Sequence, residues 1–372
     1  MPSDLHFMRL ALRLARRGFG CTSPNPMVGA VLVRNGAVIG RGWHRRAGGP
    51  HAEVEALADA RKNGGAEGST LFVTLEPCCT QGRTPPCTEA IIAAGIRRIV
   101  AAARDPNPAH CGRGFKILRR AGIAVSAGLL ADEAAALNEA FNHWIVRRRP
   151  FVTVKAAMSL DGKIATVTGE SKWITGERAK ACGMRLRAGA DAILVGINTI
   201  LRDDPSLTAR RPGTADKPWR RIILDARART PLCSKVVSDS AAASTIVVVT
   251  RAAPQRRVDA LREKVRVLTA PTAGGGIDLR WLLDRLGREN VTALLVEGGG
   301  ETNACFLAQG LAQRVAFFYA PLVLGGRAAP KAVAGEGAAR LQDGIRLRGL
   351  VWRRLGADIF LTARTAETAQ RH

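Results

Sequence analysis

Residues 69–92 read STLFVTLEPCCTQGRTPPCTEAII, and this stretch decides how the first half of the chain folds. The apolar run that ends at Glu76 predicts a strand, and the segment from Cys87 onward predicts a helix. An Asn35-Gly36 turn joins two further strand-like runs that come earlier in the chain. Strands that alternate with helices of this length predict a layered α/β domain.

The same stretch predicts a metal site. Zinc that performs chemistry takes three protein ligands and keeps one position for water, and His51, Cys78 and Cys87 supply an imidazole and two thiolates. Cysteines near a helix start are biased toward the thiolate form that binds metal. Glu53 follows His51 too closely to bind the same ion easily, so its carboxylate is free to move protons. We therefore expect one zinc ion in this half of the chain.

A closed, purely structural zinc site is the main alternative for these residues. Cys79 would then be the fourth ligand, but adjacent cysteines rarely both point at one ion, and Glu53 would have no role. Chance placement of these residues with no metal at all is the remaining interpretation.

Net charge suggests an anionic partner at first sight. The 56 Lys and Arg residues exceed the 31 Asp and Glu residues by 25 charges. The bases are mostly Arg, spread from Arg9 to Arg371 without a long unbroken run, and Tyr319 is the single tyrosine, which leaves little for base stacking. This composition argues against a nucleic-acid partner.

No apolar stretch reaches the length of about eighteen residues that spans a bilayer. The first residues carry acid early and base late around a short apolar core, the reverse of a secretory signal. We therefore expect no membrane partner and a cytoplasmic protein, whose cysteines are thiols, ligands or core residues.

Residues 146–150 read VRRRP, a charged segment closed by a proline, which indicates a domain boundary. We therefore predict two domains, spanning residues 1–146 and 150–366. Beyond it, the runs AILVG, RIILD, TIVVV and ALLVE are continuous β-branched strands of the kind buried in mostly parallel sheets. Gly298, Gly299 and Gly300 follow the last of these runs, and a helix follows them. Backbone amides at such a helix start suit the phosphate of a dinucleotide.

A family resemblance becomes specific in these motifs. His51 and Glu53 with the two cysteines form the signature of zinc-dependent base deaminases. PNPMVGAVLV (24–33), GWHRRAGGPHAEVEAL (42–57) and residues 74–92 resemble the deaminase half of the bifunctional riboflavin-biosynthesis deaminase/reductase. KAAMSLDGKIA (155–165) and LRAGADAILVGINTILRDDPSLTAR (186–210) resemble its reductase half.

The resemblance implies a cytidine-deaminase-like α/β/α layered domain, followed by a dihydrofolate-reductase-like domain with a mostly parallel sheet. It implies zinc-dependent hydrolytic deamination of 2,5-diamino-6-(5-phosphoribosylamino)pyrimidin-4(3H)-one. It then implies NADPH-dependent reduction of the ribosyl group of 5-amino-6-(5-phosphoribosylamino)uracil to ribityl. The partners would be these phosphoribosylaminopyrimidines, and the chain would form a homo-oligomer, a dimer or a tetramer.

The resemblance also implies a role for individual residues of the deaminase half. Asn25 would contact the pyrimidine, and His44 and Arg83 would reach the phosphate of the substrate. Glu53 would be the proton shuttle, and the zinc ligands would be His51, Cys78 and Cys87. The chain departs from the family pattern after Cys78, where it has Cys79, Thr80 and Gln81.

For the reductase half, the resemblance implies two sets of residues. The residues that would line the ribosyl-phosphate substrate are Ser171, Arg187, Leu207, Arg210 and Glu297. Those that would meet NADPH are Met158, Trp173, Thr199, Asp203, Gly298, Gly299 and Gly300. Guanidinium groups suit a phosphate because their paired donors match its oxygens. Lys155 and Glu297 are candidate partners for the reacting end of the sugar.

Two other function classes use part of the same pattern. A nucleic-acid base deaminase with a basic C-terminal binding domain would share the zinc ligands, and it predicts salt-dependent binding without NADPH. A non-catalytic module stabilised by zinc predicts unfolding by chelators without turnover. The motifs of the second half favour the enzyme of riboflavin biosynthesis.

Overall fold

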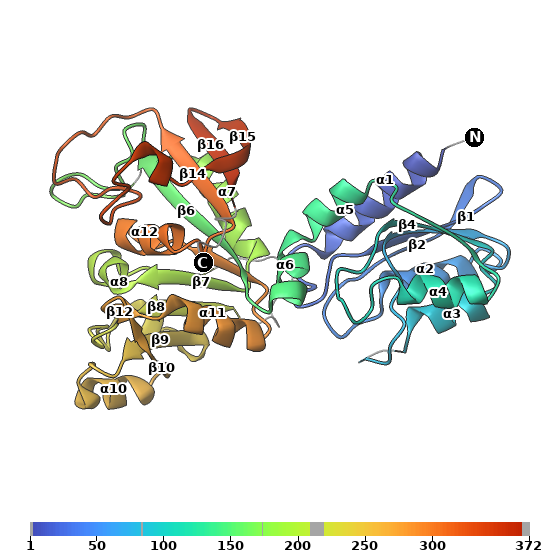
Figure 1. The fold of residues 1–372 in the computed structure, drawn as a ribbon, viewed down its shortest axis with the longest axis horizontal. Coiled ribbons are helices and arrows are strands. Elements are labelled where there is room, and N and C mark those ends of the chain that lie inside the picture. Colours follow the sequence, from blue (N-terminus) through green and yellow to red (C-terminus); the bar gives the residue numbers. More distant parts are fainter. Residues whose placement is uncertain (1–2, 83–84, 173, 209–218, 367–372) are drawn as a thin grey trace. The chain divides into compact units, whose positions relative to one another are not determined.

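The computed structural model describes residues 3–82, 85–172, 174–208 and 219–366 (Figure 1). The chain divides after Arg148 into two compact units, each with its own core. Within the described ranges, no helix is long and apolar enough to cross a membrane.

The first unit has three layers, in agreement with the expected α/β/α class. Its sheet has the order β2-β1-β3-β4-β5, in which β3, β4 and β5 are parallel and β1 is antiparallel to both of its neighbours. Helices α1 and α5 lie on one face, and α2, α3 and α4 on the other (Figure 1). The elements are α1 (Asp4–Ala15), η1 (Arg16–Gly18), β1 (Gly29–Arg34), β2 (Ala37–Trp43), α2 (Ala52–Arg61), β3 (Thr70–Leu75), α3 (Cys87–Ala93), β4 (Arg98–Ala103), α4 (Arg113–Arg120), β5 (Ala124–Ala127), α5 (Ala131–Leu137) and α6 (Glu139–Arg147).

The second unit contains a nine-stranded sheet of order β10-β9-β8-β7-β13-β6-β14-β16-β15. The first seven strands of this order, from β10 through β14, are parallel to one another. Strand β16 is antiparallel to both β14 and β15, so the sheet is mostly parallel, as expected. The four apolar runs are its strands β7, β8, β9 and β13. The strands are β6 (Phe151–Ser159), β7 (Ala192–Gly196), β8 (Arg220–Leu224), β9 (Thr245–Thr250), β10 (Arg266–Ala270), β13 (Ala293–Val296), β14 (Arg314–Ala320), β15 (Leu347–Leu355) and β16 (Asp358–Thr365).

Helices cover the second sheet, and β11 and β12 form a small separate ribbon that packs beside β9. Residues on alternate sides of β7, such as Ile193 and Leu194, belong to two separate apolar clusters, so the central strands are buried on both faces. The remaining elements are α7 (Glu177–Gly189), α8 (Ile197–Asp203), α9 (Lys235–Ser238), η2 (Ala242–Ser244), α10 (Gln255–Arg262), β11 (Thr272–Ala273), β12 (Gly276–Ile277), α11 (Leu279–Arg288), α12 (Gly300–Ala308) and η3 (Leu341–Asp343).

Arg221 of β8 is fully buried inside this unit. Its guanidinium donates to Asp239 Oδ2 at 2.6 Å and to Asp239 Oδ1 at 2.8 Å. Its other donors meet Thr245 Oγ1 and the carbonyl oxygens of Ser206 and Val236, so every N–H of the group has a partner. The bonds from Arg221 lower the pKa of Asp239. The pair therefore stabilises the unit above about pH 4, and this contribution is lost as pH falls through the lowered pKa.

Asp239→Ala should lower the free energy of unfolding of the second unit by about 3–5 kcal/mol, because it leaves a buried charge without its partner. Urea unfolding followed by circular dichroism measures the loss. Asp259→Ala is the matched control, since the Asp259–Arg262 pair at 3.1 Å is exposed and should contribute little. Equal losses in the two variants would contradict this account of Arg221.

Candidate active sites

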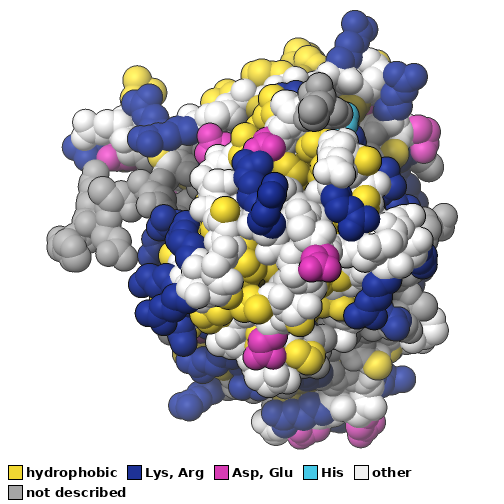
Figure 2. All heavy atoms as spheres, turned by 90° about the vertical axis from the view of Figure 1, so that its right-hand side faces the viewer, with side chains coloured by type: hydrophobic (Ala, Val, Ile, Leu, Met, Phe, Trp, Pro, Cys, Tyr) yellow, Lys and Arg dark blue, Asp and Glu magenta, His cyan; other side chains and the backbone are white. Residues whose placement is uncertain are grey.

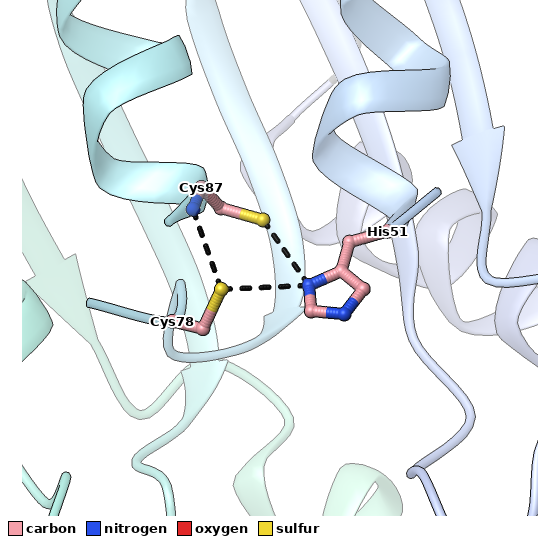
Figure 3. A group of neighbouring side chains, drawn as sticks. All are labelled: His51, Cys78 and Cys87. Carbon is pink, nitrogen blue, oxygen red and sulfur yellow. Dashed lines mark hydrogen bonds between the residues drawn. The ribbon is translucent and has the colours of Figure 1, made fainter. Parts of the chain in front are cut away.

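The first candidate site forms where strand β3 ends and helices α2 and α3 begin. His51 is the N-cap of α2, Cys87 is the first residue of α3, and Cys78 lies in the turn after β3. His51 Nδ1 is 3.4 Å from Cys78 Sγ and 3.3 Å from Cys87 Sγ (Figure 3). The backbone N–H of Cys87 also donates to Cys78 Sγ at 3.3 Å. The three side chains therefore converge on one point.

The donor chemistry of this cluster fits zinc. Hydrogen bonds from Cys87 and His51 lower the pKa of Cys78 to about 4, so one thiolate forms readily. The same bond to Cys78, together with burial, raises the pKa of Cys87. The three potential ligand atoms lie within 4.8 Å of one another, and among the residues that the structure describes Cys79 does not join them. Three ligands rather than four are typical of a zinc site that keeps a position for water.

Glu53 lies in the first turn of α2, next to the cluster, and is 3% exposed. Burial raises its pKa to about 7, and the charge of Cys78 adds to the shift. A carboxyl group with such a pKa both accepts and releases a proton near neutral pH, which is what a proton shuttle requires.

Asn25 and His44 form a pair beside this cluster. The Asn25 amide group is 3.1 Å from His44 Nε2, and His44 Nδ1 is 2.9 Å from the carbonyl oxygen of Pro50. Since the Pro50 oxygen only accepts, His44 carries its proton on Nδ1 and accepts from the Asn25 amide at Nε2. His44 is 2% exposed, and its ring stands edge-on to that of His51, so this buried ring links Asn25 to the metal cluster.

Glu76 is a residue that the sequence analysis missed. Its buried carboxylate accepts from the backbone N–H groups of Asp105, Gly112 and Phe115. It thereby fixes the loop after β4 against the turn that carries Cys78. A glutamate directly before Pro77 is the only signal in the sequence, and it does not reveal the three amides.

The second candidate site lies at the end of β13. Arg187 of α7 donates from Nε and Nη2 to the two carboxylate oxygens of Glu297 at 2.8 and 2.9 Å. Lys155 Nζ of β6 is 3.5 Å from Glu297 Oε2. Burial alone would raise the pKa of Glu297, but Lys155 and Arg187 outweigh it and lower the pKa to about 2. The predicted residues Arg187 and Glu297 are thus in direct contact.

The glycine turn after Glu297 is tightly packed at one position and open at the next. A Cβ on Gly298 would lie 2.5 Å from Cβ of Thr302, whereas a Cβ on Gly299 would meet no described atom within 4 Å. Gly299 is the N-cap of α12, which begins at Gly300. Free space over backbone amides at a helix start suits an anion.

The other predicted reductase residues lie in several places. Ser171 Oγ donates to Asp203 Oδ1 at 3.2 Å, and Thr199 precedes Asp203 on α8. Met158 of β6 and Leu207 are buried, each 3% exposed. Predicted site residues outside the described part of the chain are Arg83, Trp173 and Arg210.

Comparisons with known proteins agree with this two-part organisation. The model of the RibD C-terminal domain matches residues 150–361, and that of the cytidine and deoxycytidylate deaminase zinc-binding region matches residues 1–103. The riboflavin biosynthesis protein RibD of Aquifex aeolicus is 43% identical over 359 residues, which cover 96% of this chain and 97% of the relative. That of Actinobacillus pleuropneumoniae is 41% identical over 360 residues, with 96% and 94% covered.

Solved structures show the same likeness over the full length. Acinetobacter baumannii RibD matches with a TM-score of 0.86 and 36% identity, covering 98% of this chain and 99% of that one. A diaminohydroxyphosphoribosylaminopyrimidine deaminase/5-amino-6-(5-phosphoribosylamino)uracil reductase from Thermotoga maritima matches with a TM-score of 0.81 and 33% identity, with 98% and 99% covered. The chain belongs to the RibD family, whose members carry out the deaminase and reductase steps of riboflavin biosynthesis with a zinc-binding deaminase domain and an NADPH-dependent reductase domain.

Proposed function

We propose that residues 1–146 deaminate 2,5-diamino-6-(5-phosphoribosylamino)pyrimidin-4(3H)-one and that residues 150–366 reduce the ribosyl group of the product to ribityl. The observation that carries the first half of this proposal is the convergence of His51, Cys78 and Cys87 beside buried Glu53. The contact between Arg187 and Glu297 at the end of a parallel strand supports the second half.

In the deaminase site, His51 Nδ1 and the sulfur atoms of Cys78 and Cys87 would hold the zinc ion. Bound there, zinc supplies Lewis acidity that makes a neighbouring water molecule more acidic. Asn25 binds the pyrimidine ring, and buried His44 orients the Asn25 amide through the bond at Nε2. We assign His44 to the pyrimidine end of the substrate, because a buried ring whose two nitrogens already have hydrogen-bond partners does not suit contact with a phosphate. Arg83 remains the proposed phosphate contact.

The Glu53 carboxylate moves the protons of this reaction. Water adds to the ring carbon that bears the amino group, and Glu53 takes the proton that the water loses and passes it to the ring nitrogen. Glu53 then takes the second proton, from the hydroxyl group of this adduct, and gives it to the amino group. The C–N bond breaks as the carbonyl group forms, and ammonia leaves. The burial of Glu53 keeps this carboxyl from exchanging its proton freely with solvent.

Glu53→Gln should lower the rate of ammonia release by roughly 10²–10⁴-fold or more, because the amide cannot carry a proton. NADPH oxidation with the deaminated intermediate should stay at the wild-type rate, and the variant should still bind zinc. Assays of ammonia and of absorbance at the NADPH band measure the two steps separately. Deamination at the wild-type rate would overturn the assignment of Glu53.

In the reductase site, we infer that Arg187, Arg210 and Ser171 bind the phosphate end of the substrate, and that Leu207 and Glu297 line the sugar. Because Lys155 and Arg187 keep Glu297 ionised, its carboxylate accepts hydrogen bonds from sugar hydroxyls and does not act as an acid. Arginine is effectively never deprotonated, so Lys155 Nζ is the group of this cluster that has a proton to give. We therefore assign it the proton that accompanies hydride transfer.

When bound, NADPH would supply the hydride, and the turn after β13 is the place proposed here for its phosphate groups. The backbone N–H groups of Gly298, Gly299 and Gly300 at the start of α12 would bind its phosphate oxygens. The side chains proposed to meet other parts of the cofactor are those of Met158, Trp173, Thr199 and Asp203.

Gly299→Ala tests this placement, because the added methyl group enters space that the protein leaves open. We expect KM for NADPH to rise about tenfold or more, with an unchanged midpoint of thermal unfolding and unchanged deamination. Gly298→Ala is the structural comparison, since its methyl group collides with Thr302 and should lower the unfolding midpoint. An unchanged KM in Gly299→Ala would place the cofactor elsewhere.

We also propose that the chain acts as a homo-oligomer in the cytoplasm. Strand β15 ends the second sheet, and nearly all of its residues are exposed, including Leu350, Val351 and Trp352. An exposed edge strand that carries three adjacent apolar side chains offers a surface for another chain, and a second copy is the partner proposed here.

A further inference from the structure

A hollow at the free edge of the first sheet is lined by no residue of the proposed deaminase or reductase sites. Its volume is about 270 Å³. The side chains that surround it come from α1 and η1, from β2 and the residues after it, and from α2 and its C-cap. They are Leu14, Arg17, Arg41, Trp43, Arg45, Glu55, Ala58, Asp59 and Lys62. It is therefore a separate feature of the first unit.

Positive charge exceeds negative charge in this hollow. Four of its side chains are cationic and two are carboxylates. Arg45 pairs with Glu55 at 3.2 Å, and Lys62 lies 3.9 Å from Asp59. The two other cations, Arg17 and Arg41, have no ion pair with any residue in the described part of the chain.

Trp43 orders the guanidinium groups around it. The guanidinium carbon of Arg17 lies 4.1 Å from the centroid of the indole ring, and that of Arg45 lies 4.0 Å from it. Stacking on an aromatic ring uses the flat face of a guanidinium group and leaves its N–H edge available. It also restricts the rotamers of the arginine, so less entropy is lost when the N–H edge binds a ligand.

Local geometry, rather than the general charge of the protein, singles out this hollow. Figure 2 shows Lys and Arg side chains in several separate groups across the visible face, with acidic residues among them. A hollow with two unpaired guanidinium groups beside a tryptophan offers directed donors as well as charge. Paired N–H donors match the oxygens of a phosphate group.

We propose that this hollow is a binding site for the phosphate group of a small phosphorylated molecule. Arg17 and Arg41 supply the charge that the phosphate neutralises, and Trp43 holds Arg17 in position. The volume of about 270 Å³ lies just below the usual range for drug-sized ligands and suits a phosphate with an attached sugar. His44 lies between Trp43 and Arg45 in the chain, so the site adjoins the segment that orients Asn25.

Isothermal titration of the full-length, zinc-loaded protein with ribose 5-phosphate at low salt tests the proposal. The double variant Arg17→Ala/Arg41→Ala should lose one binding event, or weaken it at least tenfold, relative to wild type. The control Arg9→Ala/Arg13→Ala removes the same charge from exposed positions of α1 and should bind like wild type. Deaminase and NADPH kinetics should be unchanged in both, which separates this result from failure of the proposed function.

Three outcomes would overturn the proposal. The first is no difference between wild type and Arg17→Ala/Arg41→Ala. The second is an equal loss in the two double variants, which would reduce the effect to net charge. The third is binding of a single-stranded RNA oligonucleotide, lost in Arg17→Ala/Arg41→Ala, without binding of ribose 5-phosphate, because it would assign the hollow to a nucleic-acid backbone.

Discussion

Close packing of helix α2 on strand β2 is the contact on which the deaminase site depends. A Cβ on Gly42 would lie 2.2 Å from the carbonyl oxygen of Ala52, so only glycine lets the first turn of α2 approach the strand this closely. That turn carries His51 at its N-cap and Glu53 within it. If it stood farther from the sheet, the imidazole would move away from two thiols that now lie 3.3 and 3.4 Å from it.

Two buried glutamates show how environment assigns chemical roles. Glu53 is buried beside thiols, and its pKa rises to about 7, which suits a group that carries protons. Glu297 is buried between Lys155 and Arg187, and its pKa falls to about 2, which suits a permanent hydrogen-bond acceptor. The same side chain therefore serves proton transfer in one unit and substrate binding in the other.

The residues alone were sufficient to predict a layered α/β first unit, a mostly parallel second sheet and the metal cluster, because strand periodicity, cysteine spacing and helix starts are local signals. The family resemblance named Arg187 and Glu297, although not their direct contact. The three backbone hydrogen bonds to Glu76 and the burial of Arg221 were missed. Each depends on backbone groups that only the folded chain brings together. The hollow around Trp43 was missed for the same reason, because its cations are separated in the sequence and only the fold brings them together.

The zinc content of purified variants tests the central claim most directly. Metal analysis of wild type, Cys78→Ser and Cys79→Ser, with circular dichroism to confirm folding, distinguishes an open site from a closed one. The account predicts one zinc ion per chain in wild type and in Cys79→Ser, and a large loss of zinc in Cys78→Ser. Loss of zinc from Cys79→Ser to the same extent would contradict it, because Cys79 would then be a fourth ligand and no position would remain for water.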